Sequence, residues 1–107
     1  MEAYNKGNYA MTIEILNSYL EKSPQDFGIA LYLGIAQMEE GNNEMAVESF
    51  KTAKKSQKFK QQAQWYEALL YMKSNQTQKL KSSLIEISED NQHYKNKKAK
   101  ELLEKVD

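Results

Sequence analysis

The residues best suited to chemistry lie near the carboxyl end, where the single histidine follows two acids. His93 stands four residues after Glu89 and three after Asp90, so an imidazole and two carboxylates could gather in one loop. A zinc site normally needs three or four well-spaced ligands, and the chain has neither a second histidine nor a cysteine. We therefore interpret this stretch as a solvated polar loop before the last helix.

Other signals of catalysis are missing from the sequence. It contains no glycine-rich phosphate loop, no HExxH motif and no GxSxG nucleophile elbow. The lack of cysteine also excludes disulfides, thiolate nucleophiles and cysteine metal sites. We expect no enzymatic activity, no metal and no cofactor.

Charge is unevenly distributed, although the formal net charge is zero. Residues 1–50 hold two Lys and eight acids, and residues 51–107 hold thirteen Lys and seven acids. One group of lysines precedes Trp65 and Tyr66, whose rings could stack on bases. Every basic residue is Lys, and Arg, the residue best suited to bidentate phosphate and base contacts, is absent. This composition argues against nucleic acid as a partner. The lysines in question are Lys51, Lys54, Lys55, Lys58 and Lys60.

One proline and four glycines leave few places to turn, which favours long helices with short connections. Apolar residues recur at spacings of three and four, as in amphipathic helices. Asp26 is a good N-cap, Ser23-Pro24 stops the helix before it, and Gly41 ends the next. The apolar window 27–38 is about 12 residues long, shorter than a membrane helix requires. The expected helices with defined bounds are 8–21, 26–40, 61–73 and 94–106. Two more helices are expected, one between the turn 41–43 and a polar connection at 56–60, and one between the turn 74–77 and a polar run at 88–92.

Three stretches of the chain align at a constant offset of 34 residues. A fixed period of this length is typical of stacked structural repeats. Inside the first helices, Gly34 and Ala68 lie one period apart, and small residues there allow a partner helix to approach closely. The aligned sets are Gly7, Gly41 and Asn75; Thr12, Ala46 and Leu80; Leu16, Phe50 and Leu84; and Tyr19, Ala53 and Ile87.

These positions resemble the tetratricopeptide repeat family, whose units pair two antiparallel helices. The resemblance implies an all-α fold, a right-handed α-α superhelix of about two and a half hairpins closed by a C-terminal helix. Its single domain 1–107 would contain a partial repeat 1–26, repeats 27–60 and 61–94, and a capping helix 95–107. Ala30 and Gln37 depart from the family pattern, which has Trp and Tyr there. The structural repeat positions are Gly7, Gly34, Gly41, Ala46, Phe50, Ala53, Ala68 and Leu84.

In this family the first helices line a concave surface, so the resemblance implies a binding groove there. We expect a non-catalytic scaffold that binds a protein or peptide, with Trp65 as an anchor. The alternatives are a self-assembling structural module and Lys-mediated attachment to an anionic partner such as nucleic acid. The expected groove residues are Leu31, Ile35, Met38, Glu39, Gln62, Trp65, Leu69, Met72 and Lys73, with Tyr4 and Asn5 from the partial repeat.

The first repeat holds only residues 1–6 of its first helix, so the apolar face of the helix after Gly7 should be partly bare. We therefore expect either that upstream residues of a larger protein complete the hairpin or that two copies form a homodimer. The compartment stays open: the cytoplasm is the default, and the periplasm applies if a membrane anchor precedes the chain.

Overall fold

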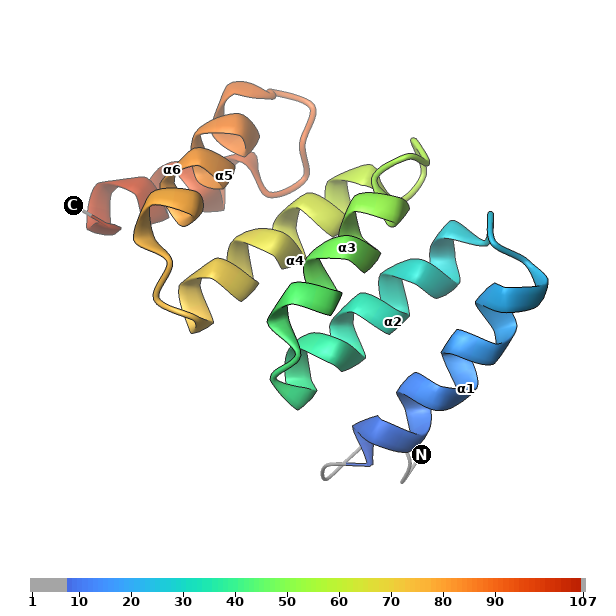
Figure 1. Cartoon of the computed structure of the whole chain (residues 1–107). Helices are drawn as coiled ribbons and strands as arrows, with labels where there is room; N and C mark the ends of the chain where they lie inside the picture. Colours follow the sequence, from blue (N-terminus) through green and yellow to red (C-terminus); the bar gives the residue numbers. More distant parts are fainter. Residues whose placement is uncertain (1–7, 107) are drawn as a thin grey trace. The chain divides into compact units, whose positions relative to one another are not determined.

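The computed structural model describes residues 8–106, and Gly7, Tyr4 and Asn5 lie outside them. This part of the chain is helical without strands, which confirms the all-α prediction (Figure 1). Its helices are α1 (Tyr9–Lys22), α2 (Phe27–Glu40), α3 (Asn43–Ala53), α4 (Lys60–Lys73), α5 (Thr77–Glu89) and α6 (Asn96–Val106).

The chain divides into two compact units, Met1–Ala63 and Gln64–Asp107. The first contains α1, α2 and α3, and the second contains α5 and α6. Helix α4 begins in the first unit and continues into the second.

Helix boundaries follow the local signals that the sequence carries. The Asp26 carboxylate accepts a hydrogen bond of 3.1 Å from the Ile29 N–H and so caps the first turn of α2. The last helix starts at Asn96, two residues later than expected. Asn96 Nδ2 donates to the carbonyls of Ser88 and Asp90 at 2.7 and 3.0 Å, which ties the start of α6 to the end of α5.

The same turn follows α2 and α4, one repeat period apart. Gly41 has φ of 90° and Asn75 has φ of 58°, both in the left-handed region. After α2 the Asn42 N–H donates to the Gln37 carbonyl at 2.8 Å, and after α4 the Gln76 N–H donates to Tyr71 at 2.9 Å. Both turns therefore satisfy the terminal carbonyls in the Schellman pattern.

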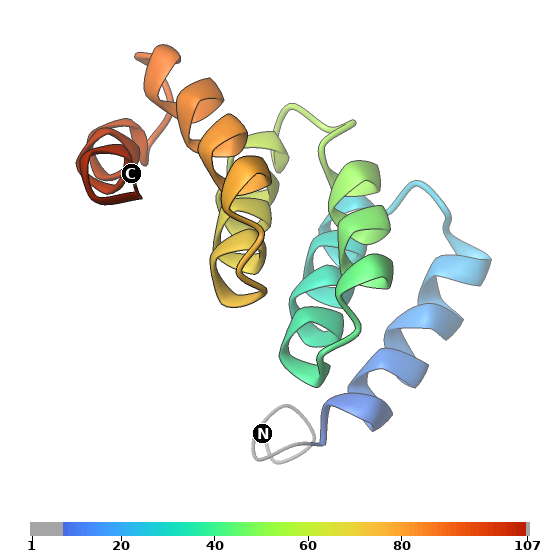
Figure 2. The same ribbon diagram turned by 60° about the vertical axis from the view of Figure 1, so that its left-hand side comes forward.

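In the first unit α2 packs against both α1 and α3, and both views show α2 and α3 side by side (Figures 1 and 2). The tightest fit is between Gly34 of α2 and the ring of Phe50 of α3. A Cβ atom added to Gly34 would lie 2.6 Å from Phe50 Cε1, closer than packed carbon atoms allow. Phe50 is fully buried, as are the small residues Ala46 and Ala53 on the same face of α3.

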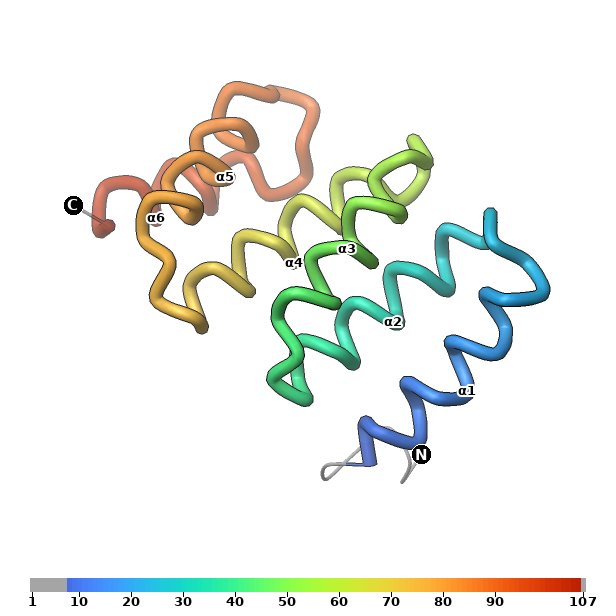
Figure 3. The backbone as a smooth tube through the Cα atoms, viewed as in Figure 1, coloured from blue at the N-terminus to red at the C-terminus, as the bar shows by residue number. Residues whose placement is uncertain are grey.

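The second unit has its own hydrophobic core, to which α4, α5 and α6 all contribute. Helices α5 and α6 pack against each other, and the tube in Figure 3 shows how the chain folds back between them. Leu102, Leu103 and Val106 of α6 pack partly buried against the core. The core residues are Trp65, Ala68, Leu80, Leu84, Ile87 and Ala99.

Candidate functional site: the outer face of α1

In the first unit, the apolar residues expected in a groove form part of the interior. Leu31, Ile35 and Met38 of α2 are at most 9% exposed. Glu39 and Gln62 are exposed to solvent. The three apolar side chains therefore offer a ligand very little surface.

In the second unit, the expected anchor Trp65 is also a core residue, 8% exposed. The ammonium group of Lys95 lies 5.1 Å from the centre of its ring, in cation–π geometry. Leu69 packs partly buried against the same core, whereas Met72 and Lys73 are exposed. Of the expected groove residues in this unit, Met72 and Lys73 thus present the most surface.

The histidine loop is exposed at Glu89, Asp90, Asn91 and Gln92, as its polar sequence indicates, but His93 itself is buried. His93 is only 3% exposed, and its Nδ1 accepts a hydrogen bond of 3.0 Å from the Lys95 N–H. Its ring stacks on Tyr94, with the ring centres 5.3 Å apart. The expectation of a solvated loop therefore fails only at His93, whose side chain is turned inward in the connection between α5 and α6. Within residues 8–106, no three His, Cys, Asp or Glu side chains are grouped to hold a metal ion.

Two tyrosines of the second unit have a pKa above the ordinary value. Burial raises the pKa of Tyr71 above its ordinary value, and the nearby Glu67 carboxylate adds to the rise. Burial likewise raises the pKa of Tyr94, with a smaller contribution from Tyr66. Both shifts come mainly from desolvation, as is usual for tyrosine rings that pack partly against the protein.

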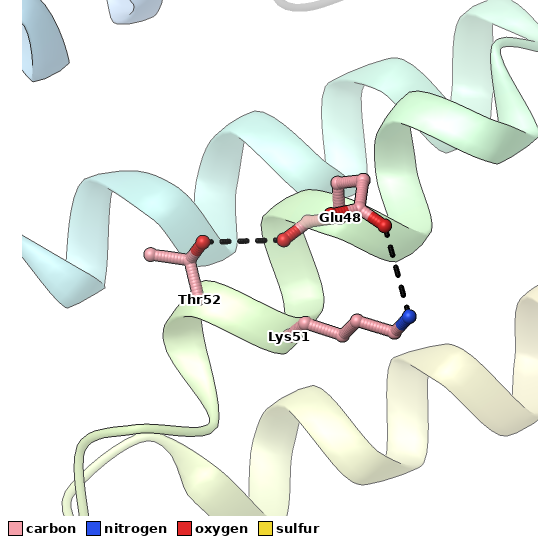
Figure 4. Close-up of polar contacts among 3 residues, drawn as sticks. All are labelled: Glu48, Lys51 and Thr52. Atoms are coloured by element: carbon pink, nitrogen blue, oxygen red, sulfur yellow. Dashed lines mark hydrogen bonds and ion pairs between the residues drawn. The ribbon is translucent and has the colours of Figure 1, made fainter.

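The lysines around the end of α3 form ordinary surface contacts. Figure 4 shows Lys51 directed at Glu48, with 3.7 Å between Nζ and Oε2, while the Thr52 hydroxyl donates to the Glu48 carbonyl. Lys58 lies 5.4 Å from the centre of the Phe59 ring. An exposed pair of this kind contributes only about 0.3–0.5 kcal/mol. The contacts give no sign of a dedicated anion site.

The most exposed apolar surface of the first unit lies on α1, where the structure records no buried residue. Ile13, Leu16 and Leu20 are half-buried on the side of α1 that packs against α2. On the opposite side, Met11 is 55% exposed, Ile15 47% and Tyr19 61%. We define the outer face of α1 as Met11, Ile15, Ser18, Tyr19 and Lys22.

The polar members of this outer face leave its apolar part accessible. The Ser18 hydroxyl donates to the Glu14 carbonyl at 3.1 Å, so it is used within the helix. Ile15, Ser18, Tyr19 and Lys22 line a shallow hollow. The result is an apolar strip from Met11 to Tyr19, about two turns long, with a small depression near its carboxyl end.

Sequence reasoning predicted a partly bare helix here. The repeat alignment included Leu16, which is half-buried, and Tyr19, which is exposed, but neither Met11 nor Ile15. Met11 and Ile15 lie four residues apart on the other side, and this second apolar stripe is the signal that could have revealed the outer face.

No helix within residues 8–106 is long and apolar enough to cross a membrane. No protein-family model, curated protein or solved structure matches the chain.

Proposed function

We propose that this chain is a non-catalytic protein-binding module that docks a helical segment of another protein on the outer face of α1. The observation that carries the proposal is the exposure of Met11, Ile15 and Tyr19 in a single strip. A helix of a partner could cover this strip with its own apolar residues, as amphipathic helices do in the grooves and faces that bind them.

Burial favours α1 over the groove that the family resemblance implies. A ligand in that groove would have to contact Leu31, Ile35, Met38 or Trp65, which are at most 9% exposed. Met11, Ile15 and Tyr19 can lose exposed apolar area on binding without any rearrangement. Each buried methylene group contributes about 0.8 kcal/mol, so the strip can supply useful affinity.

We also propose that the hairpins belong to a right-handed array of the tetratricopeptide kind. Support comes from the repeated turns at Gly41 and Asn75, which have the same hydrogen-bond pattern 34 residues apart. The close contact of Gly34 with Phe50 supports the same proposal, because such arrays need small residues where two helices meet.

Site-specific photo-crosslinking tests the docking proposal directly. A photoreactive phenylalanine analogue replaces Tyr19 in the full chain, and a matched derivative carries it at Met45 of α3, which is similarly exposed at 53%. We expect the derivative labelled at position 19 to crosslink the same protein in repeated experiments, and the derivative labelled at position 45 to crosslink none. The protein identified in this way, purified separately, should then bind the full chain with a measurable Kd.

The substitution Ile15→Glu should raise that Kd by about tenfold or more, because it places a charge in the apolar contact. The matched control Met45→Glu should leave the Kd unchanged. Circular dichroism should show native helicity in both variants, since both side chains are exposed. Equal binding by the wild type and Ile15→Glu would refute the proposal.

A further inference from the structure

The charges beside the outer face of α1 carry information about its occupant. Successive residues of an α-helix are about 100° apart, so residues seven apart lie on nearly the same side. Glu14 and Glu21 are seven residues apart, and both are exposed. They form one acidic flank of the apolar strip, whereas Thr12 lies on the opposite flank, beside Tyr19 of the strip.

A second copy of the chain in the antiparallel orientation is a poor occupant. A two-fold axis perpendicular to two antiparallel helices brings the same flank of each helix together. Glu14 and Glu21 of one copy would then face the same two acids of the other. Like charges in close opposition disfavour such a pairing.

The parallel orientation meets a different conflict. A two-fold axis along the helices places each residue of the strip opposite itself. Lys22 lies in the strip next to Ile15, Ser18 and Tyr19 around the hollow. Two Lys22 ammonium groups would therefore meet at the carboxyl end of the contact, and that arrangement is unfavourable too.

The charge of the first unit as a whole is nearly balanced, since residues 8–63 hold six Lys and seven acids. The preference for a partner therefore comes from the local flank. Glu14 and Glu21 attract a basic segment that lies along them and disfavour a second copy of the same flank.

Resting on the proposed function, we infer that the occupant of the outer face of α1 is an amphipathic helix of a different protein. Its apolar stripe covers Met11, Ile15 and Tyr19. Lysine or arginine residues line its flank facing Glu14 and Glu21, so the contact combines apolar burial with charge complementarity.

Two synthetic helical peptides test this inference. Both carry the same Leu/Ile stripe, and they differ only on one flank, which is Lys in the first and Glu in the second. Fluorescence anisotropy measures their Kd for the full chain at about 50 mM salt, where surface charges are weakly screened. We expect the Lys peptide to bind about 3- to 10-fold more tightly, from two exposed ion pairs.

Protein variants provide the matched controls. Glu14→Lys combined with Glu21→Lys should reverse the preference, whereas Glu44→Lys combined with Glu48→Lys on α3 should leave it nearly unchanged. Ile15→Glu should weaken both peptides. A preference that survives in the Glu14/Glu21 variant would overturn the inference.

The remaining outcomes separate the inference from the function on which it rests. Equal binding of both peptides that Ile15→Glu abolishes would refute the role of charge and leave docking on α1 intact. Binding of neither peptide, while Tyr19 still crosslinks a partner, would also overturn the inference alone. A concentration-dependent mass in sedimentation that Ile15→Glu removes would show a second copy as the occupant instead.

Discussion

Helices α1 and α3 occupy equivalent places in the 34-residue repeat, yet only α3 is buried along its packing face. Phe50 is fully buried, while its equivalent Leu16 is half-buried; Ala53 is fully buried, while its equivalent Tyr19 is 61% exposed. In the second unit Leu84 and Ile87 of α5 stand at the same two positions and are buried like those of α3.

This difference shows that the repeat pattern specifies a helix but does not specify what covers it. Because Gly34 has no side chain, the Phe50 ring of α3 packs directly against the backbone of α2 at this position. Helix α1 packs against α2 with its residues at most half-buried, and Met11, Ile15 and Tyr19 stay exposed. The helix that resembles its equivalents least in burial is therefore the one that we propose binds a partner.

Truncating the equivalent side chains Phe50 and Leu16 to alanine should give the largest difference in the free energy of unfolding. Phe50→Ala should lower the free energy of unfolding by about 3–5 kcal/mol, because it leaves a cavity in a closed core. Leu16→Ala should cost only about 1 kcal/mol, since Leu16 is half-buried. Urea denaturation followed by circular dichroism measures both values. Similar costs for the two substitutions would contradict the contrast between α1 and α3.

A double-mutant cycle sharpens the account of how α3 is anchored. Gly34→Ala should destabilise the protein by about 1–3 kcal/mol, because the added Cβ overlaps the Phe50 ring. In a Phe50→Leu background the same substitution should cost at least about 0.5 kcal/mol less. Additive effects in the denaturation midpoints would mean that Gly34 is not selected by this contact.

The repeated turns offer a comparison between the two units. Gly41→Ala should cost about 1–2 kcal/mol, because alanine is strained at positive φ. Gly41→Asn should cost less, since Asn already stands at the equivalent position Asn75 with φ of 58°. Thermal unfolding of the three proteins ranks these costs. An alanine variant as stable as the wild type would show that the turn relaxes.

The smallest expected effect is on alkaline stability, and it concerns the second unit. The folded state raises the pKa of Tyr71 and of Tyr94 above the unfolded value of about 10. The unfolded chain therefore releases these protons first, and stability should fall as the pH rises above about 10. Tyr71→Phe should reduce this loss in denaturation curves compared between pH 9 and 11. An unchanged pH dependence in Tyr71→Phe would show that this hydroxyl does not contribute.

Most helix boundaries could be predicted because their signals are local. Asp26 caps α2, and Ser23-Pro24 ends α1. Gly41 and Asn75 adopt the left-handed conformation, which glycine tolerates because it has no Cβ atom and asparagine tolerates better than most residues. The start of α6 was placed too early because the Asn96 side chain bonds to carbonyls at the end of α5, a contact that is not visible in the spacing of apolar residues.

Burial could not be predicted in the same way. Trp65 and Leu31 have the types and spacing of exposed groove residues as much as those of core residues, and His93 has the neighbours of a solvated loop. The sequence alone determined where most helices begin and end and which residues share a side, because these depend mainly on contacts within a few residues. Tertiary packing alone decided which of those sides is covered, since coverage depends on the neighbouring helix, and it left Met11, Ile15 and Tyr19 exposed.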